Sequence, residues 1–488
     1  MAEPDDTRLL AARHHEELGD AFFDVVEPAR FPQHILRWRN DAWADRVGLG
    51  ALSDEDWIAH FGRFEPLPGS LERPLALRYH GHQFRNYNPD LGDGRGFLFA
   101  QLRDPVDGRL LDLATKGSGE TPWSRGADGR LTLKGGVREV LATGLLEARG
   151  VDTSKSFSLI ETGENLYRGD EPSPTRSSVL VRLSHSHIRI GTFQRLAYLG
   201  DQANLRRLVD HCIRHYMPDA WAEDESARTL AFFERACANV ARMGGQWTAA
   251  GFVHGVINTD NVTITGESFD YGPYRFLPVY DPKFVAAYFD PVGLYAFGRQ
   301  PNALRWNLTR LAECLLPLTS PGRLEGVVKG FDLLFAEALT KATLDRLALD
   351  PLALEPGDPG ADLDFASAIY GFMAASGVPF ERFFFDWRGG PASERRAADS
   401  PVADLYAGAE FAPVRAGLLA RTPTPSANPS HPYFQGEPCT LLIDEIEALW
   451  APIAEADDWS AWHAKLREIA VAGEAMGTAI AGYRRPSR

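Results

Sequence analysis

Cysteine is scarce in this sequence, and its few copies stand far apart. The 488 residues include four of them, Cys212, Cys237, Cys314 and Cys439, and no two form a CxxC pair. This usage excludes a disulfide framework and the ligand spacing of a zinc finger. It is typical of a protein that works in a reducing compartment.

Long hydrophobic runs and a targeting segment are also missing. No apolar run approaches the roughly 20 residues that a helix needs to cross a bilayer. The first residues, MAEPDDTRLLAARHHEELGD, are acidic where a secretory signal needs positive charge, and they lack an apolar core. We therefore expect a soluble, cytoplasmic protein with no membrane partner.

Positive charge is in deficit. The chain has 51 Lys and Arg against 66 Asp and Glu, which gives a formal net charge of −15. Nucleic-acid-binding proteins usually carry a basic surface, so we expect no nucleic-acid partner. A net-acidic protein that binds phosphates must gather its Arg and Lys side chains at one place, and such a local cluster is the feature to look for.

What is present is an ordinary globular composition. Apolar residues make up 44% of the chain and charged residues 24%, which excludes a disordered chain and a fibrous one. The length suits one large domain, or two to three units of roughly 150 residues each.

The first 192 residues contain the strand signals. Residues 1–75 hold a polar leader and irregular, aromatic-rich segments. A glycine-rich turn at 91–96 is followed by predicted strands at 97–102 and 110–116, a predicted helix at 131–149 and a predicted strand at 177–184. In the last of these, Val179, Val181 and Leu183 alternate with Leu180 and Arg182, so we expect the two sets to face opposite sides of a sheet.

Residues 193–488 are expected to be mostly helical. Amphipathic segments at 193–217 and 225–245 precede a polar loop at 254–261, a short predicted strand at 262–264 and a second loop at 269–273. Residues 353–363 and 421–438 look like long surface loops. The fold class is therefore α+β, with a strand-rich part, a larger helical part and polar loops near their junction.

The glycine-rich turn and Lys116 form the first candidate site. A backbone without Cβ atoms can approach phosphates and aim its N–H groups at them, and Lys116 at a strand end would add positive charge. Glu139 on the next helix could pair with Lys116, as in kinase-like folds. The alternative is a tight hairpin turn with two unrelated solvated charges.

Arg182 and Arg189 form the second candidate site. Both stand in an apolar setting, and arginine holds phosphate through two hydrogen bonds without losing its charge. Two structural arginines that bond backbone carbonyls are an equally good interpretation.

The third candidate site comprises Asp260, Asn261 and Asp270 in the two polar loops. Mg²⁺ prefers oxygen ligands and keeps several waters, so one Asn, one Asp and nucleotide phosphates would suffice to hold it. Asp260 would then be free to act as a base toward a hydroxyl. Turn formation by Asn and Asp is the alternative for either loop alone, but the spacing of the two loops after a long helix favours a functional site.

Three histidine pairs resemble metal ligands: His80 with His82, His185 with His187, and His211 with His215. None has an HExxH context or a nearby third ligand in the sequence, so we interpret all six as structural.

Six segments of the sequence resemble the selenoprotein O family (SelO/YdiU). They are LGDGRG, DLATKGSGETPWSRGADGR, VREVLATGLLEARGVDT, VRLSHSHIRIGTFQ, HGVINTDNVTI and FDYGPYRFL with the following YDP, and they occur in this order between about residues 78 and 285. The resemblance implies a protein-kinase-like, two-lobed pseudokinase fold. Residues 1–75 would pack on the core, residues 76–192 would form the N-lobe, and residues 193–488 would form a helical C-lobe with catalytic and metal-binding loops at 254–285.

The resemblance also implies a role for each candidate residue. Asp260 would be the general base, and Asn261 and Asp270 would be the metal ligands. The nucleotide would be bound by Gly92, Gly94, Arg95, Lys116, Asp128, Gly129, Glu139, Arg182, Arg189 and Asp270. Among these, Arg182 and Arg189 would hold the distal phosphates.

The activity implied by the family is protein adenylylation. With Mg²⁺ or Mn²⁺, AMP would pass from ATP to Ser, Thr or Tyr hydroxyls of proteins, and pyrophosphate would leave from an ATP bound in flipped orientation. A uridylyltransferase that uses UTP and Mn²⁺, a γ-phosphoryl transferase and a non-catalytic nucleotide-binding scaffold are the alternatives. Retention of Asp260, Asn261 and Asp270 together disfavours the scaffold, because a scaffold needs no base.

Two features depart from familiar patterns. Ordinary kinases carry HRD with an Asn five positions after the Asp, whereas here Asp260 and Asn261 are adjacent in HGVINTDN, which agrees with the family. Many relatives also carry a Cys or selenocysteine near the C-terminus, whereas the last cysteine here is Cys439. We therefore do not expect redox control through a tail cysteine.

Overall fold

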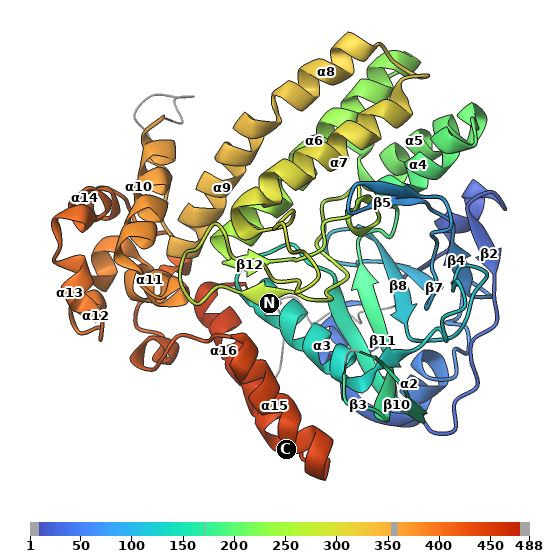
Figure 1. The fold of residues 1–488 in the computed structure, drawn as a ribbon, viewed down its shortest axis with the longest axis horizontal. Coiled ribbons are helices and arrows are strands. Elements are labelled where there is room, and N and C mark those ends of the chain that lie inside the picture. The colour runs from blue at the N-terminus through green and yellow to red at the C-terminus, as the bar shows by residue number, and fades with distance from the viewer. Residues whose placement is uncertain (1–8, 170, 353–359, 479–488) are drawn as a thin grey trace, which may run out of the picture.

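The strand-rich part of the chain is built on one antiparallel sheet. The computed structural model describes residues 9–169, 171–352 and 360–478, and within them nine strands share this sheet (Figure 1). Its main path runs through β2 (Phe23–Val25), β4 (Leu75–Leu77), β7 (Leu98–Arg103), β8 (Leu110–Lys116), β11 (Thr175–Ser184), β10 (Lys155–Leu166) and β3 (Ile35–Arg39). In addition, β1 (Ala11–Ala12) pairs with β7 and β9 (Leu131–Thr132) pairs with β11. Residues 1–75 thus supply strands to the sheet itself.

Two small hairpins lie outside this sheet. One joins β5 (Gly81–Gln83) to β6 (Asn86–Asn88), and the other joins β12 (Phe252–Val253) to β13 (Arg275–Phe276). The second hairpin brackets both polar loops expected to carry chemistry, because these loops lie between its two strands.

Helices cover both faces of the sheet and make up most of the later chain. The first three are α1 (Asp41–Arg46), α2 (Asp54–Phe61) and α3 (Leu133–Ala148). The next six are α4 (Ile190–Tyr198), α5 (Gln202–Tyr216), α6 (Glu225–Ala249), α7 (Gln300–Leu315), α8 (Pro321–Lys329) and α9 (Phe331–Leu347). The last seven are α10 (Gly360–Ser376), α11 (Phe380–Trp387), α12 (Glu394–Ala398), α13 (Ala403–Tyr406), α14 (Ala412–Leu419), α15 (Ile443–Ala456) and α16 (Ser460–Met476). In Figure 1 the sheet lies to the right, and the yellow and orange helices lie above it and to its left.

The alternation of β11 separates two hydrophobic cores. Val179, Val181 and Leu183 join the core that contains α1 and α2, whereas Leu180 joins the larger core on the α3 side. Arg182 shares the α3 side with Leu180, because residues two apart in a strand point the same way. The alternation predicted from the sequence is confirmed, and it decides which side of the sheet receives the arginine.

The predicted strands at 97–102, 110–116 and 177–184 and the helices at 131–149 and 225–245 are confirmed within a few residues. The amphipathic segment expected at 193–217 is helical but divided in two, because α4 ends at Tyr198 and α5 starts at Gln202. Between them Gly200 adopts a left-handed φ of 67°, and the Asp201 side chain accepts a hydrogen bond from the Asn204 N–H to cap α5.

Two other expectations were also wrong in part. Residues 262–264 do not form a strand, since Thr263 makes only an isolated bridge with Arg189. Of the loop expected at 353–363, residues 353–359 lie outside the described residues and Gly360 already begins α10. The loop at 421–438 is present and contains two short 3₁₀ turns, Pro425–Ala427 and Pro432–Gln435.

No helix within the described ranges is long and apolar enough to cross a membrane.

Candidate active site

Two strands and one helix bring Lys116, Arg182 and Glu139 together. The register pairs Lys116 of β8 with Leu180 of β11, so Arg182 lies two residues along the neighbouring strand and faces the same side. Helix α3 covers this side with Glu139, which is only 1% exposed. Lys116 Nζ lies 2.7 Å from Glu139 Oε2, and the nearest Arg182 nitrogen lies 3.6 Å from Glu139 Oε1. The pairing of Lys116 with Glu139 considered from the sequence is therefore present.

Asp270 joins this group from the second polar loop. Its Oδ1 lies 2.7 Å from Lys116 Nζ and 3.4 Å from the nearest Arg182 nitrogen. Burial alone would raise the pKa of this carboxyl, but the charges of Lys116, Arg182 and Arg95 outweigh burial and hold the pKa well below its usual value. Its φ of 64° is uncommon for a residue with a side chain, and such backbone conformations gather at functional sites. Asp270 is therefore an ionised carboxylate held between cations.

Arg189 is enclosed by two rings and a carboxylate. Its guanidinium carbon lies 4.1 Å from the ring centre of Tyr79 and 5.1 Å from that of Phe269. A terminal N–H donates to Asp93 Oδ1 at 3.2 Å, and Nε makes a longer bond of 3.4 Å to the carbonyl of His187. Burial lowers the pKa of the guanidinium, but the neighbouring groups, Tyr79 and Asp93 first among them, outweigh burial, so the pKa is raised above its ordinary value. Arg189 thus stays charged in a buried position where its neighbours hold it still.

Asp260 lies in the short 3₁₀ turn Thr259–Asn261 and is almost fully buried. Burial raises the pKa of its carboxyl from 3.8 to about 6, although the charge of Arg189 opposes this. Its Oδ1 has no hydrogen-bond partner among the described residues. A carboxylate with an unused oxygen and a pKa close to neutral has the properties of a general base.

The residues expected to hold a metal offer oxygen atoms. The Asn261 side-chain N–H donates to the Val256 carbonyl at 3.1 Å, a bond that does not use the amide oxygen of Asn261. Together with the ionised Asp270, this is a donor set for a hard cation such as Mg²⁺ that retains waters. The residues present are therefore compatible with Mg²⁺ or Mn²⁺.

The glycine-rich turn is packed against protein on one side. A Cβ atom placed on Gly92 would lie 2.3 Å from the Trp123 ring, and one placed on Gly94 would lie 2.8 Å from the Trp123 carbonyl. The Ser124 hydroxyl also donates to the Gly94 carbonyl at 2.6 Å. These two glycines are thus required by close packing against residues 123–124, while Arg95 at the turn is exposed.

In the part of the chain that the structure describes, Asp128 pairs with a cation outside the Lys116 group, and Gly129 lies beside it in the same loop. The Asp128 carboxylate is paired with Arg168 at 2.8 Å and accepts the Arg130 N–H at 3.0 Å on the exposed surface. Gly129 has a left-handed φ of 65°, and a Cβ on it would lie 2.2 Å from the Gly119 carbonyl. Both residues shape the loop between β8 and β9 that also contains Trp123.

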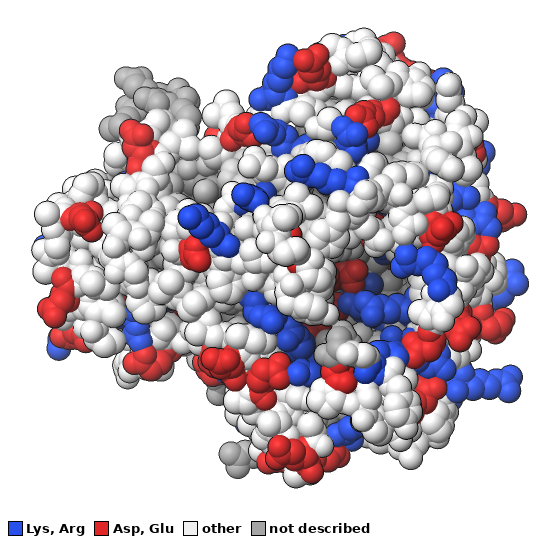
Figure 2. Space-filling view, viewed as in Figure 1, with Lys and Arg blue, Asp and Glu red and all other residues white. Residues whose placement is uncertain are grey.

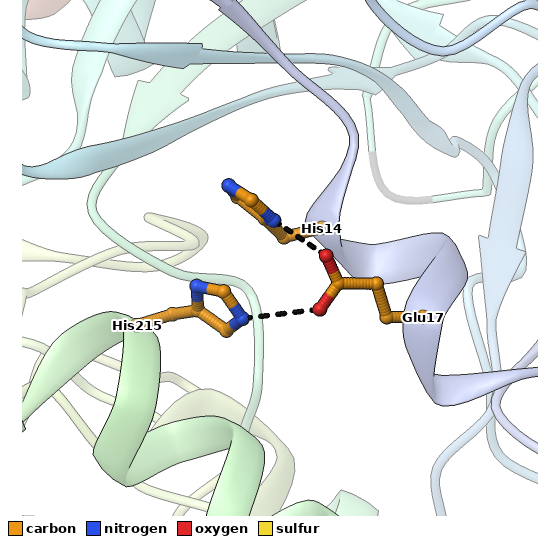
Figure 3. A group of neighbouring side chains, drawn as sticks. All are labelled: His14, Glu17 and His215. Atoms are coloured by element: carbon orange, nitrogen blue, oxygen red, sulfur yellow. Dashed lines mark hydrogen bonds and ion pairs between the residues drawn. The ribbon is translucent and has the colours of Figure 1, made fainter.

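Two histidines, His14 and His215, lie together with Glu17 in a group apart from the loops that carry Asp260 and Asp270 in the sequence. Among the described residues, the one group of three His, Cys, Asp or Glu side chains with ligand atoms close enough for a metal is His14, Glu17 and His215 (Figure 3). The two imidazoles are stacked, with centroids 4.3 Å apart and an interplanar angle of 28°.

The geometry of this group is that of a hydrogen-bonded network. The nitrogen lone pairs of an imidazole lie in the ring plane. Because the rings of His14 and His215 are stacked, their lone pairs lie in nearly parallel planes and do not converge on one metal position. In addition, Arg103 donates to His14 Nε2 at 2.9 Å, which places the proton of a neutral ring on Nδ1, and Nδ1 lies 2.7 Å from Glu17. His215 thus has two potential co-ligands that the sequence did not reveal, but their arrangement is poorly suited to a metal.

A cavity of about 510 Å³ lies between β3, α3 and α16. None of the candidate site residues lines it. The face drawn in Figure 2 is also hollowed near its middle, where basic and acidic side chains lie next to one another.

Sequence reasoning missed several residues that position the site. Asp93, Tyr79 and Phe269 hold Arg189, and Asn258 anchors the loop that carries Asp260. Asp93 could have been found, because it lies within LGDGRG and a buried arginine needs a carboxylate partner. The role of Asn258 depends on a contact across 174 residues, and the ring contacts also join distant segments, so neither left a local signal.

Comparison with known proteins gives one consistent result. A family model described as "Protein adenylyltransferase SelO" matches residues 8–470. The relatives include proteins named "Protein nucleotidyltransferase YdiU". The one from Synechocystis sp. is 44% identical and covers 93% of this chain and 96% of its own length. Those from Trichodesmium erythraeum and Trichormus variabilis are 43% and 41% identical, each over 93% of this chain and over 97% and 94% of their own. The chain therefore belongs to the SelO family and is a nucleotidyltransferase.

Proposed function

We propose that this protein transfers AMP from ATP to the hydroxyl of Ser, Thr or Tyr residues in other proteins and releases pyrophosphate. The family description supports adenylyl transfer, and the site contributes the chemistry that the reaction requires. In the transfer, the acceptor oxygen forms a bond to the α-phosphorus, its proton passes to Asp260, and the bond between the α-phosphorus and the bridging oxygen breaks.

One observation carries the proposal most directly. The buried cations of Lys116 and Arg182 meet at the partly buried Asp270 carboxylate, while Asp260 in the neighbouring loop keeps an oxygen without a partner among the described residues. The cations would stabilise the negative charge that develops on the phosphates. The free carboxylate oxygen of Asp260 would accept the hydroxyl proton. A nucleotide-binding scaffold would have no use for the second feature.

The orientation of ATP is part of the proposal. An adenylyltransferase must present the α-phosphorus to the acceptor, so the β- and γ-phosphates have to point away from Asp260. Arg182 and Arg189 would then hold the leaving pyrophosphate, as bidentate guanidinium groups do well. This is the flipped orientation, and it would be bound within a kinase-like pair of lobes in which Lys116 and Glu139 form the familiar ion pair.

The remaining candidate residues have supporting roles. Asn261 and Asp270 would hold Mg²⁺ or Mn²⁺, which neutralises phosphate charge when bound. Gly92, Gly94 and Arg95 would cover the phosphates, and Asp128 and Gly129 would contact the nucleotide through the loop between β8 and β9.

The test is a set of labelling reactions with a mixed protein extract. ATP labelled at the α-phosphate, ATP labelled at the γ-phosphate and α-labelled UTP are supplied separately with Mg²⁺ or Mn²⁺. We expect covalent α-label from ATP with the wild type, none with Asp270→Ala, and full label with the control Asp399→Asn, whose carboxylate is 73% exposed. Label from γ-labelled ATP alone would mean a kinase, and stronger label from UTP would mean a uridylyltransferase.

A further inference from the structure

Three apolar side chains project into solvent from the loop that connects β13 to α7. Tyr288 is 80% exposed, Phe289 46% and Val292 74%. Single exposed apolar residues are common, but three within five positions form a patch of the kind that contacts other proteins. We call Tyr288, Phe289 and Val292 the 288–292 patch.

The loop that carries this patch is held firmly. The buried Asp290 carboxylate accepts hydrogen bonds from the N–H groups of Leu294 and Tyr295 at 2.9 and 2.8 Å. Arg299 donates to the carbonyls of Val292 and Gly293 at 2.8 and 3.1 Å. The side chains are therefore exposed on a loop that its own hydrogen bonds hold in place.

The patch is joined to the loop that contains the proposed base. The Tyr295 hydroxyl donates to Asn258 Oδ1 at 2.8 Å, and the same oxygen accepts the N–H of Phe84 at 3.0 Å. The Phe84 ring lies 5.9 Å from the Phe289 ring and 5.1 Å from the Tyr295 ring. Since Asn258 is two residues from Asp260, the patch stands beside the place where an acceptor hydroxyl has to arrive.

Exposed cations accompany the apolar side chains. Arg85 follows Phe84 directly and is exposed, with its guanidinium 5.6 Å from the Trp306 ring. Arg125 is also exposed and near enough for its charge to favour the ionised form of Asp260. An approaching segment therefore meets apolar surface and positive charge together, a combination that suits a segment with apolar and acidic side chains.

We infer that the 288–292 patch and Arg85 form the docking surface for the acceptor protein. The occupant is a segment of that protein with a bulky apolar side chain on the patch and an acidic side chain near Arg85, close in sequence to the accepting hydroxyl. This inference rests on the proposed function, because it concerns the acceptor of that transfer.

The experiment maps the hydroxyls that become labelled. A mixed protein extract is incubated with α-labelled ATP and the wild-type enzyme, and the residues around each modified hydroxyl are identified by mass spectrometry. We expect enrichment of bulky apolar and acidic residues at these sites. The most heavily labelled protein is then purified and used as acceptor for steady-state kinetics.

Two variants and two matched controls separate docking from catalysis. Tyr288→Ser with Val292→Ser removes the two most exposed side chains, and Tyr167→Ser with Val106→Ser removes a Tyr and a Val that are 76% and 71% exposed elsewhere. Arg85→Glu is matched by Arg395→Glu, whose side chain is 96% exposed.

We expect the first double variant to raise the KM for the acceptor by about tenfold or more, as loss of two buried apolar contacts implies. The KM for ATP and the kcat at saturating acceptor should stay as in the wild type. Arg85→Glu should abolish the acidic enrichment, and both controls should behave as the wild type.

Two results would overturn the inference in distinguishable ways. If the wild type labels hydroxyls but the variants keep its site preference and acceptor KM, the docking surface is elsewhere while the proposed function stands. If the wild type labels no hydroxyl at all, the proposed function fails and the docking surface fails with it.

Discussion

The Asp260 carboxylate sits where burial works against its charge. Because burial raises its pKa to about 6, this carboxyl is ionised above that pH, where it can serve as the base we propose, and protonated below it. We expect kcat/KM for nucleotidyl transfer to fall about tenfold for each pH unit below 6. Asp260→Asn should lower kcat by at least about a hundredfold at pH 8 and leave ATP binding nearly intact. A pH profile with no acidic limb near 6 would show that another group is the base.

The same pKa predicts how stability changes with pH. A carboxyl whose pKa is higher in the folded state stabilises the folded state at pH values below its pKa in the unfolded chain, 3.8. This stabilisation is lost as the pH rises through the folded-state pKa of about 6. The difference corresponds to about 3 kcal/mol. Asp260→Asn should therefore be more stable than the wild type toward urea at pH 8, with a smaller difference at pH 4. Equal shifts at both pH values would indicate that the gain has another cause.

The pair of Lys116 and Glu139 predicts a coupled loss of stability. Lys116→Met leaves the carboxylate of Glu139, which is 1% exposed, with Arg182 at 3.6 Å as its nearest cation. Removing one partner of a buried ion pair costs about 3–5 kcal/mol. Combining it with Glu139→Gln should restore most of this free energy of unfolding but no activity. A double variant as unstable as the sum of the two single variants would show that the residues do not interact.

Much of this residue-scale picture could be predicted from the sequence. Lys116 ends an apolar strand and Glu139 lies in the next amphipathic helix, so their meeting follows from local patterns. The motif LGDGRG makes Asp93 a candidate partner for a buried arginine, but the sequence does not tell that this arginine is Arg189. Their pairing depends on a contact across 96 residues, which only the packing of the sheet against the loops determines.

At the scale of elements, the β5–β6 hairpin fixes the loop that contains Asp260. The His82 N–H donates to the Thr259 hydroxyl at 2.7 Å, and a Cβ atom on Gly81 would lie 3.0 Å from Asp260 Oδ1. Gly81→Ala should therefore displace the carboxylate and lower kcat by about tenfold without changing ATP affinity, as a small misplacement of a catalytic group does. Calorimetric ATP binding and initial rates of label transfer would measure the two effects.

Gly326→Ala is the matched control for this substitution. Gly326 lies in α8, and a Cβ atom on it would meet nothing within 4 Å. Since alanine favours a helix over glycine by roughly 1 kcal/mol, we expect slightly higher stability and unchanged activity. If Gly81→Ala behaved in the same way, the hairpin would not constrain the base.

Element prediction succeeded where a single pattern covers a whole element. The predicted strand at 110–116 is a mostly apolar run and the predicted helix at 225–245 has helical spacing, and both are present, the helix as α6 (Glu225–Ala249). The amphipathic segment at 193–217 forms two helices, because the left-handed Gly200 and the cap at Asp201 divide it. Local turn chemistry outweighed periodicity there. The strand expected at 262–264 is absent for a different reason. A strand needs a neighbouring segment that pairs with it over several residues, whereas only Thr263 forms a bridge, with Arg189, and the sequence alone could not show this.

At the scale of the whole molecule, buried arginines connect parts that are distant in sequence. Arg149 follows α3 and is 7% exposed. It donates to the carbonyls of Ala250 at 2.8 Å and Cys439 at 3.1 Å, and it pairs with Glu381 at 3.0 Å. One side chain thus satisfies groups from the end of α6, from the segment before α15 and from α11. Periodicity cannot reveal such a connection, because Arg149 and Glu381 look like ordinary charged residues locally and backbone carbonyls leave no signal in the sequence.

Arg149→Leu should consequently lower the free energy of unfolding by at least about 3 kcal/mol, because it leaves two carbonyls without their donor and Glu381 with Arg346 as its remaining ion-pair partner. Arg149→Lys keeps the charge but cannot reach all three acceptors at once, so its loss should be smaller. Urea denaturation measures both, and Arg395→Leu, which removes a highly exposed side chain, should leave the midpoint unchanged. Since Arg149 touches none of the proposed catalytic groups, the folded fraction of each variant should retain the wild-type kcat. A variant that kept its stability but lost kcat would instead show that Arg149 helps to position the candidate site through α3, the helix that carries Glu139.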